Sequence, residues 1–326
     1  MNILIVKTSS LGDVIHMLPA ITDAVQAKPE LHIDWLVEES FAAIPAWHPA
    51  VDRVIPIAMR RWKKHWTAGS TWREIGAARA ALQQQPYDLV IDSQGLLKSA
   101  LWSRMARGTR VGYDSGSARE PLASWFYERT LSVSRQQHAI DRNRQLMAQT
   151  LGYVPKNVAP DYGLQGLSTR LPPVGITLPA HSVIGLHGTS RSDKLWPVEG
   201  WKALAQALSE TQCSLILPWG NEDERLRAED IARSASHVMV LPRLGLDALA
   251  VLIDQAQAVV GVDTGLLHLA AALGKPGLAL YTATPPALTG AVSDRHAASP
   301  LCNLSSPQEL HTTAVIGALM NLLQNG

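Results

Sequence analysis

The stretch that most constrains the fold of this chain runs from Ala258 to Leu280 and reads AVVGVDTGLLHLAAALGKPGLAL. Its valine-rich first five residues are typical of a strand buried in a parallel sheet. A short apolar helix is expected from Leu266 to Leu273, followed by a Gly-Lys-Pro break and a second apolar strand. The stretch therefore predicts a strand–turn–helix–strand unit of a parallel α/β sheet.

The turn between this strand and this helix carries the first candidate site. Asp263 and Thr264 are placed to cap the helix, and Gly265 lets a ligand approach the backbone closely. Free N–H groups and the helix dipole favour an anion there, and His268 lies one turn further on. The turn is interpreted as a phosphate or diphosphate cradle. The alternative is an ordinary turn with a capped helix and a core histidine.

Strand–helix alternation occurs twice along the 326 residues, before and after a stretch rich in proline and glycine at 152–179. The length, with 46% apolar residues, suits two cores rather than one. We therefore expect an α/β fold with two doubly wound Rossmann-like domains, residues 1–160 and 161–326, facing each other across a cleft. A closing helix is expected at 306–323, packing back on the first domain.

The charge of the chain is unevenly distributed. Residues 1–165 hold 19 Lys and Arg against 15 Asp and Glu, whereas residues 166–326 hold 10 against 13. The first half is therefore the expected host of an anionic partner, but the surplus is too small for a nucleic-acid surface. Two cysteines predict neither a disulfide framework nor a metal cluster. The short apolar start predicts no signal peptide, and unbroken runs of about 20 apolar residues are missing, so a cytoplasmic protein without a membrane span is expected.

The chain opens with a predicted strand at 2–6, a polar loop at 7–12 and a helix at 13–27. Neither a dinucleotide-binding nor a P-loop glycine pattern is present in this loop. Asp13 begins the helix, where a carboxylate favours the helix dipole. It is also placed at the mouth of the expected cleft, where it could accept a proton from a substrate.

Residues 59–66, MRRWKKHW, hold four cations, one histidine and two tryptophans. Cations interleaved with tryptophan suit a nucleic-acid groove, an anionic membrane interface or one anionic carbohydrate or lipid headgroup. The alternative is a solvated basic loop anchored by Trp62 and Trp66. Arg119 and His138 could serve the same cleft, or be a surface residue and a helix cap.

Two loops of the second half strengthen the anion interpretation. Thr189, Ser190 and Lys194 supply hydroxyls and one cation, which could neutralise a departing diphosphate. Trp219 and Glu224 could hold a base and a ribose. Alternatively, the lysine is solvated, the tryptophan is a core residue and the glutamate only helps its helix to start.

Six motifs in order along the chain resemble glycosyltransferase family 9, the bacterial heptosyltransferases of lipopolysaccharide inner-core synthesis: KTSSLGDVIHMLPA, PIAMRRWKKHW, AREPLASWFY, HGTSRSDKLWP, LPWGNEDE and VDTGLLHLAAAL. The resemblance implies a GT-B fold and inverting transfer of heptose from ADP-L-glycero-β-D-manno-heptose. It implies the Kdo sugar of Kdo2-lipid A as acceptor, with no cofactor and no bound metal.

The resemblance also implies residue roles. Asp13 would be the general base and Lys194 the second catalytic residue. The donor site would comprise Thr189, Ser190, Lys194, Glu224, Leu244, Asp263, Thr264, Gly265 and His268. The acceptor site would comprise Ser10, Gly12, Arg60, Arg61, Lys64, Arg119 and His138. Ser190 stands where the family pattern has a threonine, and Leu244 where it has a methionine.

The implied partners are ADP-heptose, Kdo2-lipid A and the anionic cytoplasmic face of the inner membrane, touched peripherally by a monomer that binds no nucleic acid. Two alternatives stay open at this point. One is a heptosyltransferase that acts on a later core acceptor. The other is a nucleotide-sugar binding protein or epimerase that uses the same cleft without transferring a sugar.

Overall fold

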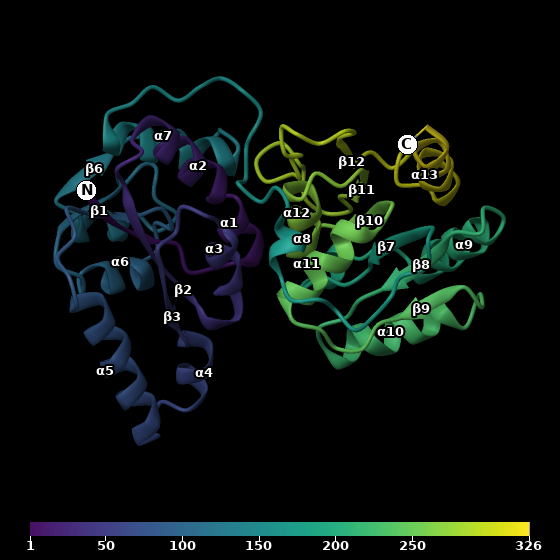
Figure 1. Cartoon of the computed structure of the whole chain (residues 1–326), viewed down its shortest axis with the longest axis horizontal. Coiled ribbons are helices and arrows are strands. Elements are labelled where there is room, and N and C mark those ends of the chain that lie inside the picture. Colours follow the sequence, from purple (N-terminus) through teal and green to yellow (C-terminus); the bar gives the residue numbers. More distant parts are fainter. Residues whose placement is uncertain (326) are drawn as a thin grey trace. The chain divides into compact units, whose positions relative to one another are not determined.

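The computed structural model describes residues 1–325 and divides into two compact units, Met1–Gly163 and the residues from Leu164 onward. Each unit contains one six-stranded sheet with helices around it (Figure 1). All neighbouring strands of both sheets run parallel. The predicted α/β class, with two doubly wound units, is confirmed.

The first sheet has the strand order β3-β2-β1-β4-β5-β6. Its strands are β1 (Asn2–Val6), β2 (His32–Glu38), β3 (Arg53–Ile57), β4 (Leu89–Asp92), β5 (Thr109–Tyr113) and β6 (Arg129–Leu131). β1 lies between β2 and β4, with Ile5 in register with Trp35 on one side and Ile91 on the other. The order reverses beside β1, so the loops that follow β1 and β4 emerge next to each other at the carboxyl edge, where such sheets bind ligands.

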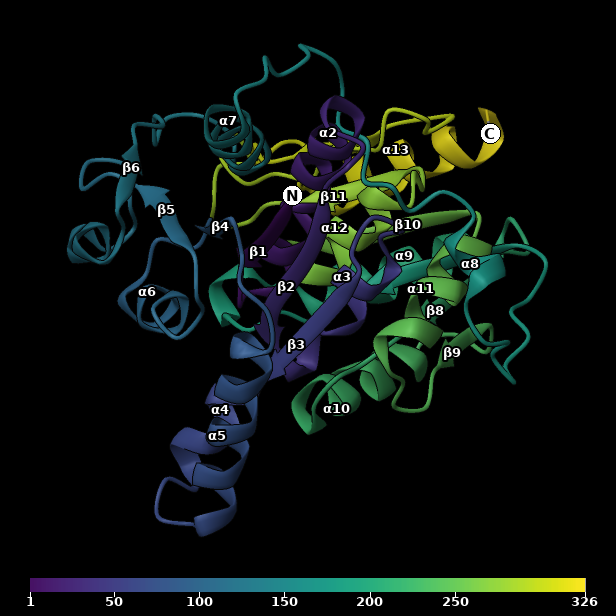
Figure 2. The ribbon, with the colours of Figure 1, turned by 60° about the vertical axis from the view of Figure 1, so that its left-hand side comes forward.

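The helices of the first unit are α1 (Leu11–Ile15), α2 (Leu18–Ala27), η1 (Glu39–Phe41), α3 (Ala43–Trp47), α4 (Met59–Lys64), α5 (Gly69–Gln83), α6 (Leu97–Ser103), η2 (Pro121–Phe126) and α7 (Ala139–Leu151). Figure 2 shows α4, α5 and α6 on the same side of this unit. The single helix expected at 13–27 is wrong: α1 ends before His16, and α2 restarts with Pro19 as its second residue. Proline lacks an N–H group and cannot continue a helix through that point.

The alternative of a solvated basic loop at 59–66 is wrong, since the first six of these residues form α4 (Met59–Lys64). Trp62 is buried on the inner face of α4, in contact with Trp102 of α6, with ring centroids 5.9 Å apart. The segment is thus packed against the core through this ring. Trp66, the other tryptophan of the segment, is instead 67% exposed.

The second sheet has the order β12-β11-β10-β7-β8-β9. Its strands are β7 (Ser182–Leu186), β8 (Ser214–Leu217), β9 (Val238–Val240), β10 (Ala258–Val262), β11 (Gly277–Leu280) and β12 (Leu301–Leu304). Its helices are α8 (Leu167–Arg170), η3 (Ser192–Lys194), α9 (Val198–Ser209), α10 (Glu222–Ala232), α11 (Leu246–Gln255), α12 (Gly265–Ala272) and α13 (Thr312–Asn325). The opening stretch of the sequence analysis is thus β10–α12–β11, as predicted.

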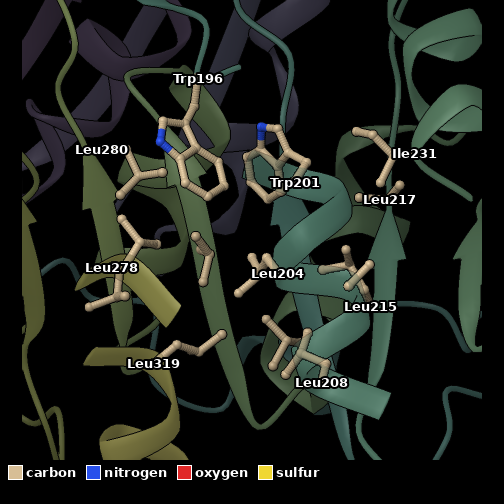
Figure 3. Close-up of a cluster of buried hydrophobic side chains, with 14 of the residues drawn as sticks. Trp196, Trp201, Leu204, Leu208, Leu215, Leu217, Ile231, Leu278, Leu280 and Leu319 are labelled. Atoms are coloured by element: carbon tan, nitrogen blue, oxygen red, sulfur yellow. The ribbon is translucent and has the colours of Figure 1, made fainter. Parts of the chain in front are cut away.

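The core of the second unit fills the space between the sheet and helices α9, α10 and α13 (Figure 3). Trp196 and Trp201 meet edge to face, with ring centroids 5.4 Å apart, above a layer of leucines from α9 and the strands. Leu319 of α13 joins the same cluster, so this helix packs on its own unit. Its start at Thr312 is six residues later than expected. Within residues 1–325, every helix is too short or too polar to cross a membrane.

Candidate active site

The loop that follows β1 is tied to the loop that follows β4. The backbone N–H groups of Thr8 and Ser9 donate to Gln94 Oε1 over 3.1 and 3.3 Å, and Lys7 Nζ donates to the Ser93 carbonyl over 2.8 Å. Burial lowers the pKa of Lys7, although the negative charges of Asp13 and Asp92 act to raise it. The roles of Lys7 and Gln94 carry no local sequence signal, because their partners lie more than 80 residues away along the chain.

Asp13 sits in the first turn of α1, with its side chain held from two directions. Ser10 donates to Asp13 Oδ2 through its backbone N–H (2.8 Å) and its hydroxyl (3.1 Å), in a capping-box arrangement. Arg119 Nη1 lies 3.6 Å from the same oxygen. The sequence-predicted residues Ser10, Gly12, Asp13 and Arg119 are therefore brought together.

A second carboxylate, Asp92, is fully buried at the end of β4. It accepts hydrogen bonds from the N–H groups of Gln94 (2.8 Å) and Gly95 (3.2 Å) and from the Tyr127 hydroxyl (2.8 Å). Burial raises the pKa of this carboxyl, and the donors partly oppose that rise. Asp92 thus shapes the turn that presents Gln94 to the Asp13 loop.

The cations of α4 have different surroundings. The Arg61 guanidinium pairs with Glu39 (2.9 Å) and Glu74 (2.9 Å), so its charge is already balanced. Arg60 stacks over the Phe41 ring at 5.1 Å, and its backbone N–H donates to Glu38, whose pKa is raised by burial. Lys64, at the end of the helix, is exposed. Arg60 and Lys64 are therefore better placed than Arg61 to meet an anion.

His138 is the N-cap of α7 and accepts a hydrogen bond from the Ile140 N–H at its Nδ1 (3.2 Å). Its ring meets His16 edge to face, with centroids 5.5 Å apart. His16 directly follows α1, so His138 belongs to the surroundings of the Asp13 loop. His138 therefore caps α7 and also lies close to the end of α1.

In the second unit, β10, β7 and β8 are neighbours, so the three predicted donor loops leave the same sheet edge. Lys194 Nζ lies 2.6 Å from Asp263 Oδ2, which also accepts the Thr284 hydroxyl at 2.7 Å. His268 Nε2 is 3.9 Å from Asp263 Oδ1. The Thr189 hydroxyl donates to the Asp263 carbonyl at 3.0 Å. These contacts bring three of the predicted donor residues, Thr189, Lys194 and His268, together around Asp263.

The expected side-chain cap of α12 is wrong. Thr264 is the N-cap residue, but its side chain accepts no capping hydrogen bond, and Asp263 is engaged by Lys194 and Thr284 instead. Burial alone would raise the pKa of Asp263, yet those two hydrogen bonds and the nearby positive charges bring it below its ordinary value. The first turn of α12 therefore keeps donors that the Thr264 side chain does not occupy, as an anion site needs.

Glu224 lies in the first turn of α10, where its Oε2 accepts the Gly220 N–H at 2.7 Å. A Cβ on Gly188 would lie 2.6 Å from the Glu224 carboxyl carbon, so a larger residue there would displace the Glu224 side chain. Trp219 donates its indole N–H to the Leu241 carbonyl at 2.6 Å. Ser190 is exposed, and Leu244 is half-buried between β9 and α11.

Among residues 1–325, no cluster of three or more His, Cys, Asp or Glu side chains could hold a metal ion.

Two doubly wound parallel units in one chain, each built on a six-stranded sheet, are the architecture of the GT-B class of fold. The model of glycosyltransferase family 9 (heptosyltransferase) matches residues 75–318. The chain therefore belongs to glycosyltransferase family 9, as the six motifs predicted.

Named relatives agree with this assignment. The chain is 48% identical over 292 residues to lipopolysaccharide heptosyltransferase 1 of Escherichia coli strain K12, covering 89% of this chain and 90% of the relative. It is 50% identical over 296 residues to the protein of the same name from Pseudomonas aeruginosa, covering 89% and 81%. The solved structure of E. coli heptosyltransferase WaaC with ADP is similar at a TM-score of 0.89 and 42% identity, over 100% of this chain and 99% of that chain.

Proposed function

We propose that this enzyme transfers L-glycero-D-manno-heptose from ADP-heptose to the Kdo of Kdo2-lipid A, with inversion, in lipopolysaccharide inner-core synthesis. The observation that carries the proposal is similarity along nearly the whole chain to proteins named lipopolysaccharide heptosyltransferase 1. The donor is supported by a structure 43% identical in sequence, that of E. coli WaaC with ADP-2-deoxy-2-fluoro heptose, which matches 100% of this chain.

The donor is proposed to occupy the second unit. The free N–H groups at the start of α12 and the Lys194 ammonium would receive the diphosphate. Glu224, held beside Gly220, would accept hydrogen bonds from the ribose, and Leu244 would contact the adenine. Thr189, Ser190 and His268 complete the donor set, with Thr264 and Gly265 supplying backbone at the helix terminus.

The acceptor is proposed to occupy the first unit. Asp13 would take the proton from the attacking hydroxyl while the bond between the anomeric carbon and the diphosphate breaks. Arg60, Lys64 and Arg119 would face the carboxylates or phosphates of the glycolipid, with Arg61 fixing α4 through its two glutamates. Ser10 holds Asp13, Gly12 leaves room beside it, and His138 supports the loop from α7.

The test is ADP release by the purified protein from ADP-heptose, with and without Kdo2-lipid A, in chelator and in magnesium. Acceptor-dependent release in chelator is expected, because Lys194 and the α12 terminus are proposed to stabilise the diphosphate. Release restored only by magnesium would overturn that part of the mechanism. Preference for a heptose-bearing core acceptor would favour a later transfer step. Isomerised sugar without acceptor would favour an epimerase.

We also propose that the enzyme works as a monomer on the cytoplasmic face of the inner membrane, since its proposed acceptor is a lipid. The cations of α4 and the exposed Trp66 support contact with anionic headgroups. Flotation of the protein with membranes, abolished by high salt, is the expected behaviour.

A further inference from the structure

Three large apolar side chains are exposed on two neighbouring elements of the first unit, α6 and η2. Trp125 is 81% exposed, Leu101 51% and Leu122 49%. Single exposed apolar residues are common on soluble proteins, but grouped ones are characteristic of an interaction surface.

The two elements form one continuous surface because they share a small core. Ala100 of α6 packs with Ala123 and Tyr127 in a buried cluster, and Phe126 packs against it. The Leu97 N–H at the start of α6 also donates to Glu120 Oε2 at 2.6 Å, just before η2 begins. Leu101 directly follows Ala100, and Leu122 directly precedes Ala123. Both leucines therefore lie beside the contact between α6 and η2.

The rim of this surface is cationic. Lys98, Leu101 and Arg104 recur at intervals of three along the exposed face of α6. The Arg104 guanidinium lies over the Phe126 ring at 5.9 Å, which joins the two elements. Of the neighbouring carboxylates, Glu128 is paired with Arg110, whereas Glu120 accepts the neutral Leu97 N–H and keeps its negative charge. Lys98 and Arg104 outnumber Glu120, so the net charge at this surface is positive.

We propose that the α6–η2 surface docks on an anionic phospholipid bilayer. Trp125, Leu101 and Leu122 enter the boundary between headgroups and acyl chains, while Lys98 and Arg104 meet the headgroup phosphates. Tryptophan suits this boundary because its ring is apolar and its N–H is polar. The combination of exposed apolar side chains with a net positive charge matches an anionic bilayer better than it matches a protein partner.

The surface adjoins the proposed acceptor site. Arg119 directly precedes Glu120 and η2, and its Nη1 lies 3.6 Å from Asp13 Oδ2. Lys98 Nζ donates to the Ser9 hydroxyl at 3.3 Å, in the loop that carries Asp13. Docking here would keep the acyl chains of a lipid-linked acceptor in the bilayer while its sugar reaches Asp13. The inference rests in this respect on the proposed function.

The test is co-sedimentation with vesicles of phosphatidylethanolamine and phosphatidylglycerol. The variant Leu101→Ser/Leu122→Ser/Trp125→Ser should bind at least about ten-fold more weakly than the wild type, because it loses the apolar area that enters the bilayer. Its kcat and KM with deacylated, water-soluble acceptor should be unchanged. Leu226→Ser, on α10 of the second unit and 52% exposed, is the matched control and should bind vesicles like the wild type.

A second measurement reports insertion at one position. A polarity-sensitive fluorophore on Leu122→Cys, in a Cys302→Ser background that leaves only the buried Cys213, should shift to the blue on these vesicles. It should not shift on phosphatidylcholine vesicles, which lack the net negative charge.

Unchanged vesicle binding by the triple variant, or no shift of the fluorophore, would overturn the proposal. So would a wild-type dimer in solution that the triple variant splits while vesicle binding persists, because the surface would then join two copies of the chain. Failure of the proposed function is distinguishable: it would appear as no ADP release with the deacylated acceptor, whatever the vesicle result.

Discussion

Lys194→Met removes the cation that balances Asp263 while keeping a side chain of similar length. Breaking a fully buried ion pair costs about 3–5 kcal/mol, because one charge is left without its partner. Here the two side chains are 18% and 11% exposed, and Asp263 keeps its hydrogen bond from Thr284. We therefore expect a smaller loss, about 2 kcal/mol in the free energy of unfolding.

The loss of activity should be larger than the loss of stability explains. If Lys194 stabilises the departing diphosphate, its removal should lower kcat on the order of 10²–10³-fold, the usual cost of removing one such electrostatic group. Urea unfolding gives the stability change, ADP release gives the rate, and calorimetric titration with ADP gives the donor affinity.

The double variant Lys194→Met/Asp263→Asn separates the two roles. Neutralising Asp263 removes the uncompensated charge, so stability should return to within about 1 kcal/mol of the wild type. The rate should stay low, because the ammonium is still missing. Recovery of turnover together with stability would refute the reasoning, since Lys194 would then act only by balancing Asp263.

Three further predictions concern single sites. Asp13→Ala should keep ADP binding but lose on the order of 10²–10⁴ in kcat, the usual contribution of a general base, and unimpaired ADP release would remove Asp13 from that role. Arg60→Ala/Lys64→Ala should raise the acceptor KM with donor affinity nearly intact. Arg61→Ala should chiefly lower Tm, because Arg61 is held by Glu39 and Glu74. An equal rise of the acceptor KM in both variants would contradict these separate roles. His187 is buried, and burial followed by the nearby Arg227 charge lowers its pKa to about 4. The unfolded chain therefore binds more protons, and about 3 kcal/mol of stability present above pH ~6.5 should be lost as the pH falls toward ~4. His187→Gln should flatten that part of a urea-midpoint profile against pH, and an unchanged slope would assign the pH dependence to other groups.

The parts of the fold that follow from local sequence pattern could be predicted. The run of five apolar residues at 258–262 is a strand because both sheet faces are covered, and the Gly-Lys-Pro break ends α12 as expected. The residues around Asp263 could be grouped in advance, because the carboxyl ends of parallel strands meet at one edge. The placement of Lys194 beside Asp263 follows from that topology.

Long-range contacts could not be predicted. Residues 59–64 form a helix whose Trp62 ring is buried against Trp102, forty residues away, and nothing in the local pattern indicates that contact. Likewise Gln94 holds the loop between β1 and α1 by accepting hydrogen bonds from the N–H groups of Thr8 and Ser9. Its residue type alone does not indicate this role. The Asp263 side chain failed to cap α12 because a cation and a hydroxyl from other loops offered stronger partners than the local N–H groups.

If the donor diphosphate binds beside Lys194, as proposed, the Lys194–Asp263 pair would let a site that contains a carboxylate still favour an anionic leaving group. The ammonium is balanced by Asp263 in the structure, so it would attract a bound donor only moderately. As the bond to the anomeric carbon breaks, the diphosphate would gain negative charge, and its attraction for the ammonium would grow while that of Asp263 stays constant. On this proposal the interaction is stronger in the transition state than in the ground state, which is the condition for raising kcat rather than merely tightening binding. Asp263→Asn alone should thus bind ADP more tightly than the wild type without a matching gain in turnover, and weaker ADP binding by this variant would refute the argument.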